Sequence, residues 1–239
     1  MRHDTLPTSV HSDSALAFGS QAVLAPFALD LAPGRWIAVL GQSGIGKSTM
    51  LRALAGLLPQ ARVTPDLRGR IAWMAQTDLL LPWLPLVDNL CLGARLRGET
   101  ADTERARALL GQVGLSGREN SLPATLSGGM RQRAALARTL MEDRPLVLMD
   151  EPFAALDLVN KRKLHQLSAE LLAERCVIFV THDPAEALSL ADHVYILAGT
   201  PATLTLAAEP SGARPRDVLA PEHVAALRAI QATLLAEAA

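Results

Sequence analysis

Uninterrupted apolar runs recur along the chain and are separated by segments of mixed character. They lie at 36–40, 146–149, 177–180 and 194–197. Continuous apolar runs of this length are typical of strands that are covered on both faces, as in a parallel sheet. Residues 70–75 predict a further strand. We therefore expect a buried, mostly parallel sheet at the centre of the fold.

Helical spacing of apolar residues predicts helices between these strands. The first follows a glycine-rich loop and runs to about Leu57, and others are expected at 86–97, 102–113, 130–141 and 160–174. Strands that alternate with helices indicate an α/β fold.

The two ends of the chain have a different character. Residues 1–14 are polar without periodicity, so we expect them to be poorly ordered, whereas 15–31 predict two short strands. Beyond residue 200 we expect a strand and an amphipathic helix. Its apolar face would carry Val224, Leu227, Ile230 and Leu234.

The composition bounds the size and class of the protein. A chain of 239 residues can bury a sizeable core, as one large α/β domain or a domain with an embedded subdomain. The net charge of −1 and the 3% of aromatic residues provide neither the basic field nor the stacking surface typical of nucleic-acid binding. We therefore expect no nucleic-acid partner. Cys91 and Cys176 lie far apart in apolar stretches, which indicates core thiols in a reducing compartment.

No segment has the uninterrupted apolar length that a membrane-spanning helix needs. The nearest approach is 79–92, which Pro82, Pro85, Asp88 and Asn89 interrupt. The first residues also lack the apolar core of a signal peptide. With 49% hydrophobic residues, the chain has apolar side chains for a large core or for a surface that binds a partner.

A phosphate-binding loop stands directly after the first buried strand. It reads Gly41, Gln42, Ser43, Gly44, Ile45, Gly46, Lys47, Ser48, Thr49, and a predicted helix follows it. In such a loop the main-chain N–H groups surround the β-phosphate, the lysine reaches the β- and γ-phosphates and the serine binds Mg²⁺. The strand–loop–helix setting predicts that the chain binds a nucleoside triphosphate.

Polar residues end the other buried strands. Asp150 and Glu151 follow 146–149, where carboxylates face the ligand crevice of a parallel sheet. We expect Asp150 to hold Mg²⁺ and Glu151 to orient or deprotonate the attacking water. His182 after 177–180 is placed to contact the γ-phosphate. Alternatively, the acids begin a loop, the histidine is structural and Gln76, at the end of 70–75, is a solvated loop residue.

A second small-residue turn opens the helix expected to end near Met141. Residues 126–133 read Leu-Ser-Gly-Gly-Met-Arg-Gln-Arg. A helix start offers unpaired N–H groups and partial positive charge to a phosphate, and glycines allow close approach. By itself such a turn is more often an ordinary helix cap.

Taken in order, these elements resemble the ATP-binding cassette (ABC) family over residues 15–200. The resemblance rests on 41–49, Gln76, 126–133, 146–151, 154–157 as the D-loop and His182 as the switch histidine. It implies a P-loop core with a mostly parallel sheet, a small antiparallel part and a helical subdomain near 77–142.

The resemblance also implies the composition of the site. ATP lies between two subunits, where Ser127, Gly128, Gly129 and Gln132 of one chain face the nucleotide of the other. Gln76 contacts Mg²⁺ and senses the γ-phosphate. Phe18 stands where the family usually has an adenine-stacking tyrosine, and Ala155 stands where the D-loop usually has serine.

The family further implies partners. Residues 76–84 resemble the groove that receives a helix of a membrane permease, although these apolar residues could equally cover the helical subdomain's own core. The chain looks most like ATPases of nitrate, sulfonate, taurine or thiamine-precursor importers. Such subunits form dimers at the cytoplasmic face of the inner membrane and work with an extracytoplasmic solute-binding protein. The alternatives are an exporter subunit, a soluble ABC ATPase that acts on ribosomes or DNA, and a small-molecule kinase.

Overall fold

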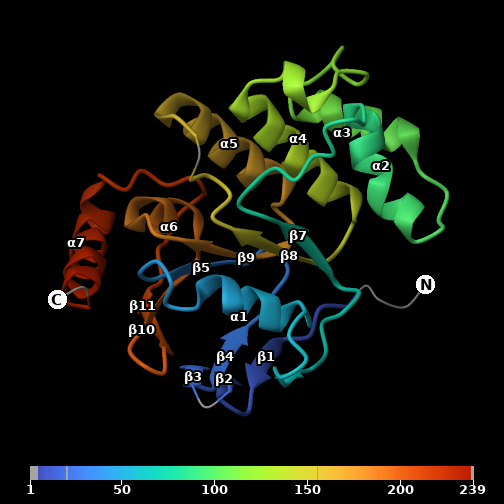
Figure 1. The fold of residues 1–239 in the computed structure, drawn as a ribbon. Coiled ribbons are helices and arrows are strands. Elements are labelled where there is room, and N and C mark those ends of the chain that lie inside the picture. Colours follow the sequence, from blue (N-terminus) through green and yellow to red (C-terminus); the bar gives the residue numbers. More distant parts are fainter. Residues whose placement is uncertain (1–4, 20, 155, 238–239) are drawn as a thin grey trace.

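The centre of the fold is a six-stranded sheet with the strand order β11-β10-β5-β9-β8-β7 (Figure 1). The computed structural model describes residues 5–19, 21–154 and 156–237. The strands are β5 (Trp36–Leu40), β7 (Ile71–Met74), β8 (Leu146–Asp150), β9 (Cys176–Thr181), β10 (His193–Ala198) and β11 (Thr203–Ala208). All neighbours pair in parallel except β10 and β11. The predicted α/β fold with a mostly parallel sheet is confirmed.

Every residue of β5, β8 and β9 is buried, as their continuous apolar runs predict. Alternate side chains of β5 enter two different cores. Trp36 and Leu40 belong to one, and Ile37 and Val39 to the other. The first core is covered by helices, and the second by one helix and the small antiparallel sheets.

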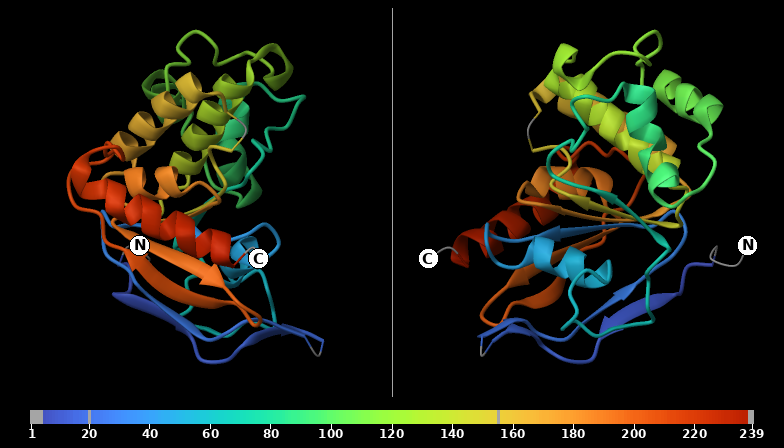
Figure 2. Two further views of the ribbon diagram at one scale, coloured as in Figure 1. Left: turned by 90° about the vertical axis from the view of Figure 1, so that its left-hand side faces the viewer. Right: turned by 45° about the vertical axis from the view of Figure 1, so that its right-hand side comes forward.

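The helices of the first core are α4 (Gly128–Met141), α5 (Leu158–Leu171), α6 (Pro184–Leu190) and α7 (Pro221–Ala236). The opposite face carries α1 (Lys47–Leu54). Figure 2 shows α7 lying along the outside of the β10–β11 hairpin. The C-terminal amphipathic helix is present as predicted: Ile230 is buried, and Leu227 and Leu234 pack against the same core.

The antiparallel part holds strands β1 (Ser9–Ser12), β2 (Leu16–Phe18), β3 (Gln21–Leu24), β4 (Phe27–Asp30) and β6 (Val63–Thr64). The expectation of poor order for residues 1–14 is wrong for Ser9–Ser12. This strand pairs with β4 on one side and β6 on the other, with Val10 fully buried opposite Leu29. Two inward side chains are too few to give a recognisable period.

A group of helices with its own core lies beside the sheet. It contains α2 (Leu86–Leu96), α3 (Thr103–Gln112), the 3₁₀ turn η1 (Pro123–Thr125) and one face of α4. Ala134 and Ala137 of α4 pack in this core, whereas Ala135 and Leu136 pack in the core of the sheet. Helix α4 therefore packs in both parts. None of the helices in the described ranges is long and apolar enough to span a bilayer.

Candidate functional site

The phosphate loop is shaped by glycines in left-handed backbone. Gly46, the N-cap of α1, has φ 113°, and Gly44 has φ 83°. A Cβ on Gly46 would also lie 3.1 Å from Leu24 and 3.2 Å from Val23. No side chain caps α1, so its first N–H groups remain available to an anion.

Lys47 is folded back into this loop and is 6% exposed. Its Nζ donates to the carbonyl oxygens of Gly41 at 2.7 Å and Gln42 at 2.9 Å. Burial lowers the pKa of this ammonium, and the nearby charges of Glu151 and Asp150 oppose that effect only in part. The negative charge of a bound phosphate would favour the ammonium form.

Ser48, near the start of α1, meets Asp150, at the end of β8, although β9 lies between β5 and β8 in the sheet. The Ser48 hydroxyl donates to Oδ1 of Asp150 at 2.8 Å. Within the described residues no cluster of three or more His, Cys, Asp or Glu side chains could hold a metal by itself. One hydroxyl and one carboxylate fit Mg²⁺, which usually takes its other ligands from water and substrate phosphates.

Three strand ends meet at the carboxylate of Glu151. Its Oε2 accepts a hydrogen bond from Nε2 of Gln76 at 3.2 Å and lies 3.5 Å from Nδ1 of His182. These residues follow β8, β7 and β9, which are neighbours in the sheet. Glu151 itself has φ +46°, a conformation that is uncommon for a residue with a side chain. The structure thus brings together the three residues that sequence analysis took from separate strand ends.

The turn at the start of α4 is exposed. Ser127 is the N-cap, and its Oγ accepts the N–H of Met130 at 3.3 Å. A Cβ on Gly128 would meet no atom within 4 Å, whereas one on Gly129 would lie 3.0 Å from Asn160. Gln132 is different, because its buried amide donates to the carbonyl of Pro152 at 2.7 Å. The structure therefore places Gln132 beneath the loop after Glu151 and away from the exposed turn.

The remaining candidate residues belong to β2 and to the loop before α5. Phe18 ends β2 with 47% of its surface exposed, so it is not a core residue. Ala155 lies outside the described residues. Asp157, which ends the same loop, caps α5 by accepting the N–H groups of Val159 and Asn160.

The segment 76–84 has both buried and exposed apolar side chains. Leu80 is buried in the core of the helical group, whereas Leu79 and Trp83 are 59% and 69% exposed. The amide of the buried Asn89 bonds main-chain groups of Leu81 and Leu84. The exposed apolar side chains are thus carried on a well-ordered loop.

Two arginines of α4 fasten the same loop. Nη1 of Arg138 donates to the carbonyl of Leu79 at 2.7 Å and Nη2 to that of Asp78 at 2.6 Å, while Nε of Arg131 pairs with the Asp78 carboxylate at 2.9 Å. Sequence analysis missed both residues. The seven-residue spacing, which puts them on one face of a helix, was the only available signal.

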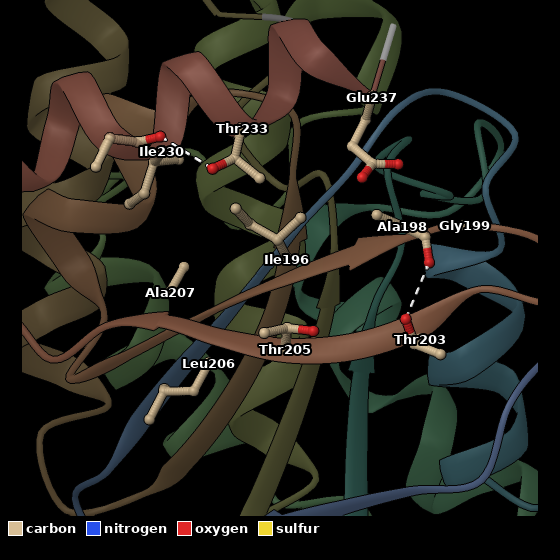
Figure 3. Close-up of a pocket in the computed structure, with 11 residues that line it drawn as sticks. Ile196, Ala198, Gly199, Thr203, Thr205, Leu206, Ala207, Ile230, Thr233 and Glu237 are labelled. Atoms are coloured by element: carbon tan, nitrogen blue, oxygen red, sulfur yellow. Dashed lines mark hydrogen bonds between the residues drawn. The ribbon is translucent and has the colours of Figure 1, made fainter.

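A cavity of about 330 Å³ lies between α7 and the β10–β11 hairpin (Figure 3). Two of its threonine hydroxyls are already bonded to the main chain: Thr203 donates to the carbonyl of Ala198 and Thr233 to that of Ala229. This cavity is a gap in helix packing, and the phosphate-binding chemistry is concentrated at the strand ends.

Comparison with known proteins agrees with this geometry. The family model described as ABC transporter matches residues 24–154. A Haemophilus influenzae protein described as an uncharacterized ABC transporter ATP-binding protein is 42% identical over 94% of this chain and 96% of its own length. An aliphatic sulfonates import ATP-binding protein of Pseudomonas fluorescens is 47% identical over 76% of this chain and 70% of its own length.

A solved structure is similar over nearly the same length. It is a dimeric ATP-binding cassette in a post-hydrolysis state bound to ADP and Pi, 25% identical, with a TM-score of 0.70. The match covers 85% of this chain and 99% of the other.

Proposed function

The chain belongs to the ABC transporter family, and from this membership we propose that it is the ATP-hydrolysing subunit of an importer for aliphatic sulfonates or similar small organic anions. As a member of the family it is an ATPase that uses ATP and Mg²⁺. The similarity to aliphatic sulfonates import ATP-binding proteins supports import over export. The convergence of Gln76 and His182 on Glu151 is the observation that carries the catalytic part of the proposal.

Each residue has a distinct task in the proposed reaction. The Glu151 carboxylate orients the attacking water and accepts its proton, because it is the acceptor group at the end of β8. Gln76 and His182 hold that carboxylate in place. The Lys47 ammonium, already directed along the loop, binds the β- and γ-phosphates. Ser48 and Asp150 would hold Mg²⁺, which would neutralise charge on the phosphate oxygens.

The exposed turn at Ser127 completes the site of a second subunit in this proposal. The phosphate loop already supplies one helix start to its own nucleotide, so the bare main chain at Gly128 is available to another. Ser127 of the partner subunit would then face the γ-phosphate bound at Lys47. The dimeric assembly of the related cassette supports this arrangement.

The variant Glu151→Gln tests the catalytic assignment. It should bind ATP normally, accumulate as an ATP-bound dimer and lose hydrolysis by roughly 10²–10³-fold, the size typical of removing one preorganised catalytic group. The measurements are phosphate release at saturating ATP and size-exclusion chromatography with ATP. Near-normal phosphate release would show that another group activates the water.

We also propose that Leu79 and Trp83 dock the membrane permease at the inner face of the membrane. Exposed aromatic and aliphatic side chains on an ordered loop are typical of a protein-binding surface. The variant Trp83→Ser should reduce uptake of a labelled sulfonate by cells while the purified subunit hydrolyses ATP as before.

Leu57→Ser is the matched control, since Leu57 is 63% exposed in the turn that follows α1. Uptake should stay normal in this control. Equal loss of uptake in both variants would count against a specific docking role for Trp83.

A further inference from the structure

Helix α5 is tied to helix α6 directly beside the candidate site. Nζ of Lys161 donates to Oδ2 of Asp183 at 2.8 Å and lies 2.9 Å from Oε1 of Glu186. The Lys161 side chain is 21% exposed and that of Glu186 only 2%, so water screens this pair poorly. The ammonium therefore bridges two carboxylates at the start of α6 and offsets one of their two charges.

The elements joined by this lysine carry the two reactive loops. The chain that follows Glu151 leads within a few residues into α5, where Asp157 is the N-cap. His182 immediately precedes Asp183, the N-cap of α6, whose Oδ1 accepts the N–H groups of Ala185 and Glu186. Lys161 thus connects the chain after Glu151 to the chain after His182.

A second contact closes the same connection. Nε2 of His165, also on α5, lies 3.4 Å from Oε1 of Glu186. The imidazole packs edge-on against Phe153 with 4.5 Å between ring centres. Phe153 is buried two residues after Glu151. The loop of the carboxylate and the loop of the histidine therefore rest on one ionic cluster, composed of Lys161, His165, Asp183 and Glu186.

The pKa shifts in this cluster favour the charged forms that the ion pair requires. Burial by itself would lower the pKa of Lys161, but its bonds to Asp183 and Glu186 outweigh that effect and the pKa is raised. Burial would raise the pKa of Glu186, yet contacts with His165, Thr181 and Lys161 hold it below the ordinary value. The lysine is charged and the glutamate is ionised at neutral pH.

We infer that Lys161 is a positioning residue for ATP hydrolysis: by holding Asp183 and Glu186 it keeps His182 within reach of the Glu151 carboxylate. Without the ammonium, Asp183 and the buried Glu186 would repel each other, and the start of α6 would move or one carboxylate would take up a proton. His182, one residue away, would move with it. This inference rests on the proposed role of His182.

The test is the kinetics of Lys161→Met, a change that keeps the length of the side chain and removes its charge. A cavity of about 760 Å³ borders Lys161, so methionine can be accommodated without a clash. We expect kcat to fall roughly 10- to 100-fold, as for a small misplacement of a catalytic group. The KM for ATP should stay nearly unchanged, because the phosphate loop is untouched.

Lys163→Met is the matched control, since Lys163 is exposed on the same helix. It should leave kcat unchanged. Lys161→Arg should recover most of the activity, because a guanidinium can bridge the same two carboxylates. If Lys161→Met does not fold, Lys161→Gln, which keeps a hydrogen-bond donor, replaces it. Normal kcat in the folded uncharged variant overturns the inference.

A double-mutant cycle with His182→Ala separates positioning from general stability. If Lys161 acts through His182, then Lys161→Met should change kcat by less than about threefold in the His182→Ala background, since coupled residues are not additive. Additive losses would overturn the inference and leave the proposed function intact. Normal turnover of His182→Ala alone would instead contradict the proposed role of the histidine.

Discussion

Two helix starts in this molecule are rich in glycine, yet they are built differently. At α1 the N-cap is Gly46 in left-handed backbone, packed near Val23 and Leu24 and without a side-chain cap. At α4 the N-cap is Ser127, whose hydroxyl already accepts a helix N–H, and the next residue, Gly128, has open space around it. The first start has a buried lysine folded into its loop, and the second is exposed with open space at Gly128.

These two helix starts therefore differ in function. The start of α1 is a site that one chain can complete, whereas the start of α4 is a surface that needs another molecule. Around α1 the chain provides an ammonium that bonds the loop's own carbonyl groups and a hydroxyl that bonds the Asp150 carboxylate. Around Ser127 the chain provides main chain and one hydroxyl. A helix start by itself does not make a binding site, and the surrounding charges decide which of the two can hold a nucleotide alone.

The largest expected effect is at the phosphate loop before α1. Lys47→Met removes the ammonium that donates into the phosphate loop and should weaken ATP binding to the monomer, with hydrolysis falling by about 10²-fold or more. Fluorescent-nucleotide titration of the monomer measures the binding. Undiminished affinity would mean that main-chain N–H groups of α1 suffice, and the contrast between the two helix starts would disappear.

The next largest effect is expected at the exposed turn at the start of α4. Ser127→Arg should leave ATP binding to the monomer unchanged and abolish hydrolysis, because a long charged side chain would stand between two closing subunits. The lost cap should destabilise the fold by only about 1 kcal/mol. Loss of ATP binding in the monomer would instead place Ser127 in the site of its own chain.

The smallest effects come from adding one methyl group to each turn. Gly46→Ala should destabilise the protein by roughly 1–3 kcal/mol, since φ 113° is unfavourable for alanine. Gly128→Ala should change stability by less than about 0.5 kcal/mol, yet reduce hydrolysis in the dimer. Thermal unfolding and phosphate release measure both variants. Equal destabilisation would show that the turn at Gly128 is also constrained by packing.

The parts of the site that could be predicted are those with a local cause. The loop 41–49 follows an apolar run, and Glu151, Gln76 and His182 each end a strand, so the common edge of a parallel sheet brings them together. The ties of Lys161 to Asp183 and of Arg138 to Leu79 join residues distant in sequence. They depend on how two helices pack, which one sequence does not specify.

The same reasoning applies to two features that local sequence patterns do not reveal. Strand β1 depends on β4 and β6 for its burial, so Val10 by itself gave no signal. Gln132 sits within a motif associated with nucleotide contact, and only the packing of α4 beneath Pro152 shows that its amide is already engaged.

The left-handed backbone of Glu151 has a consequence for protein engineering. A redesign that selected sequences for folding stability alone would favour glycine or asparagine at this position, since both adopt φ near +46° more easily than glutamate. Such a redesign would yield a protein with a higher free energy of unfolding but without the carboxylate that Gln76 and His182 contact. Stabilised versions of this subunit should therefore hold residue 151 fixed and seek their gains elsewhere.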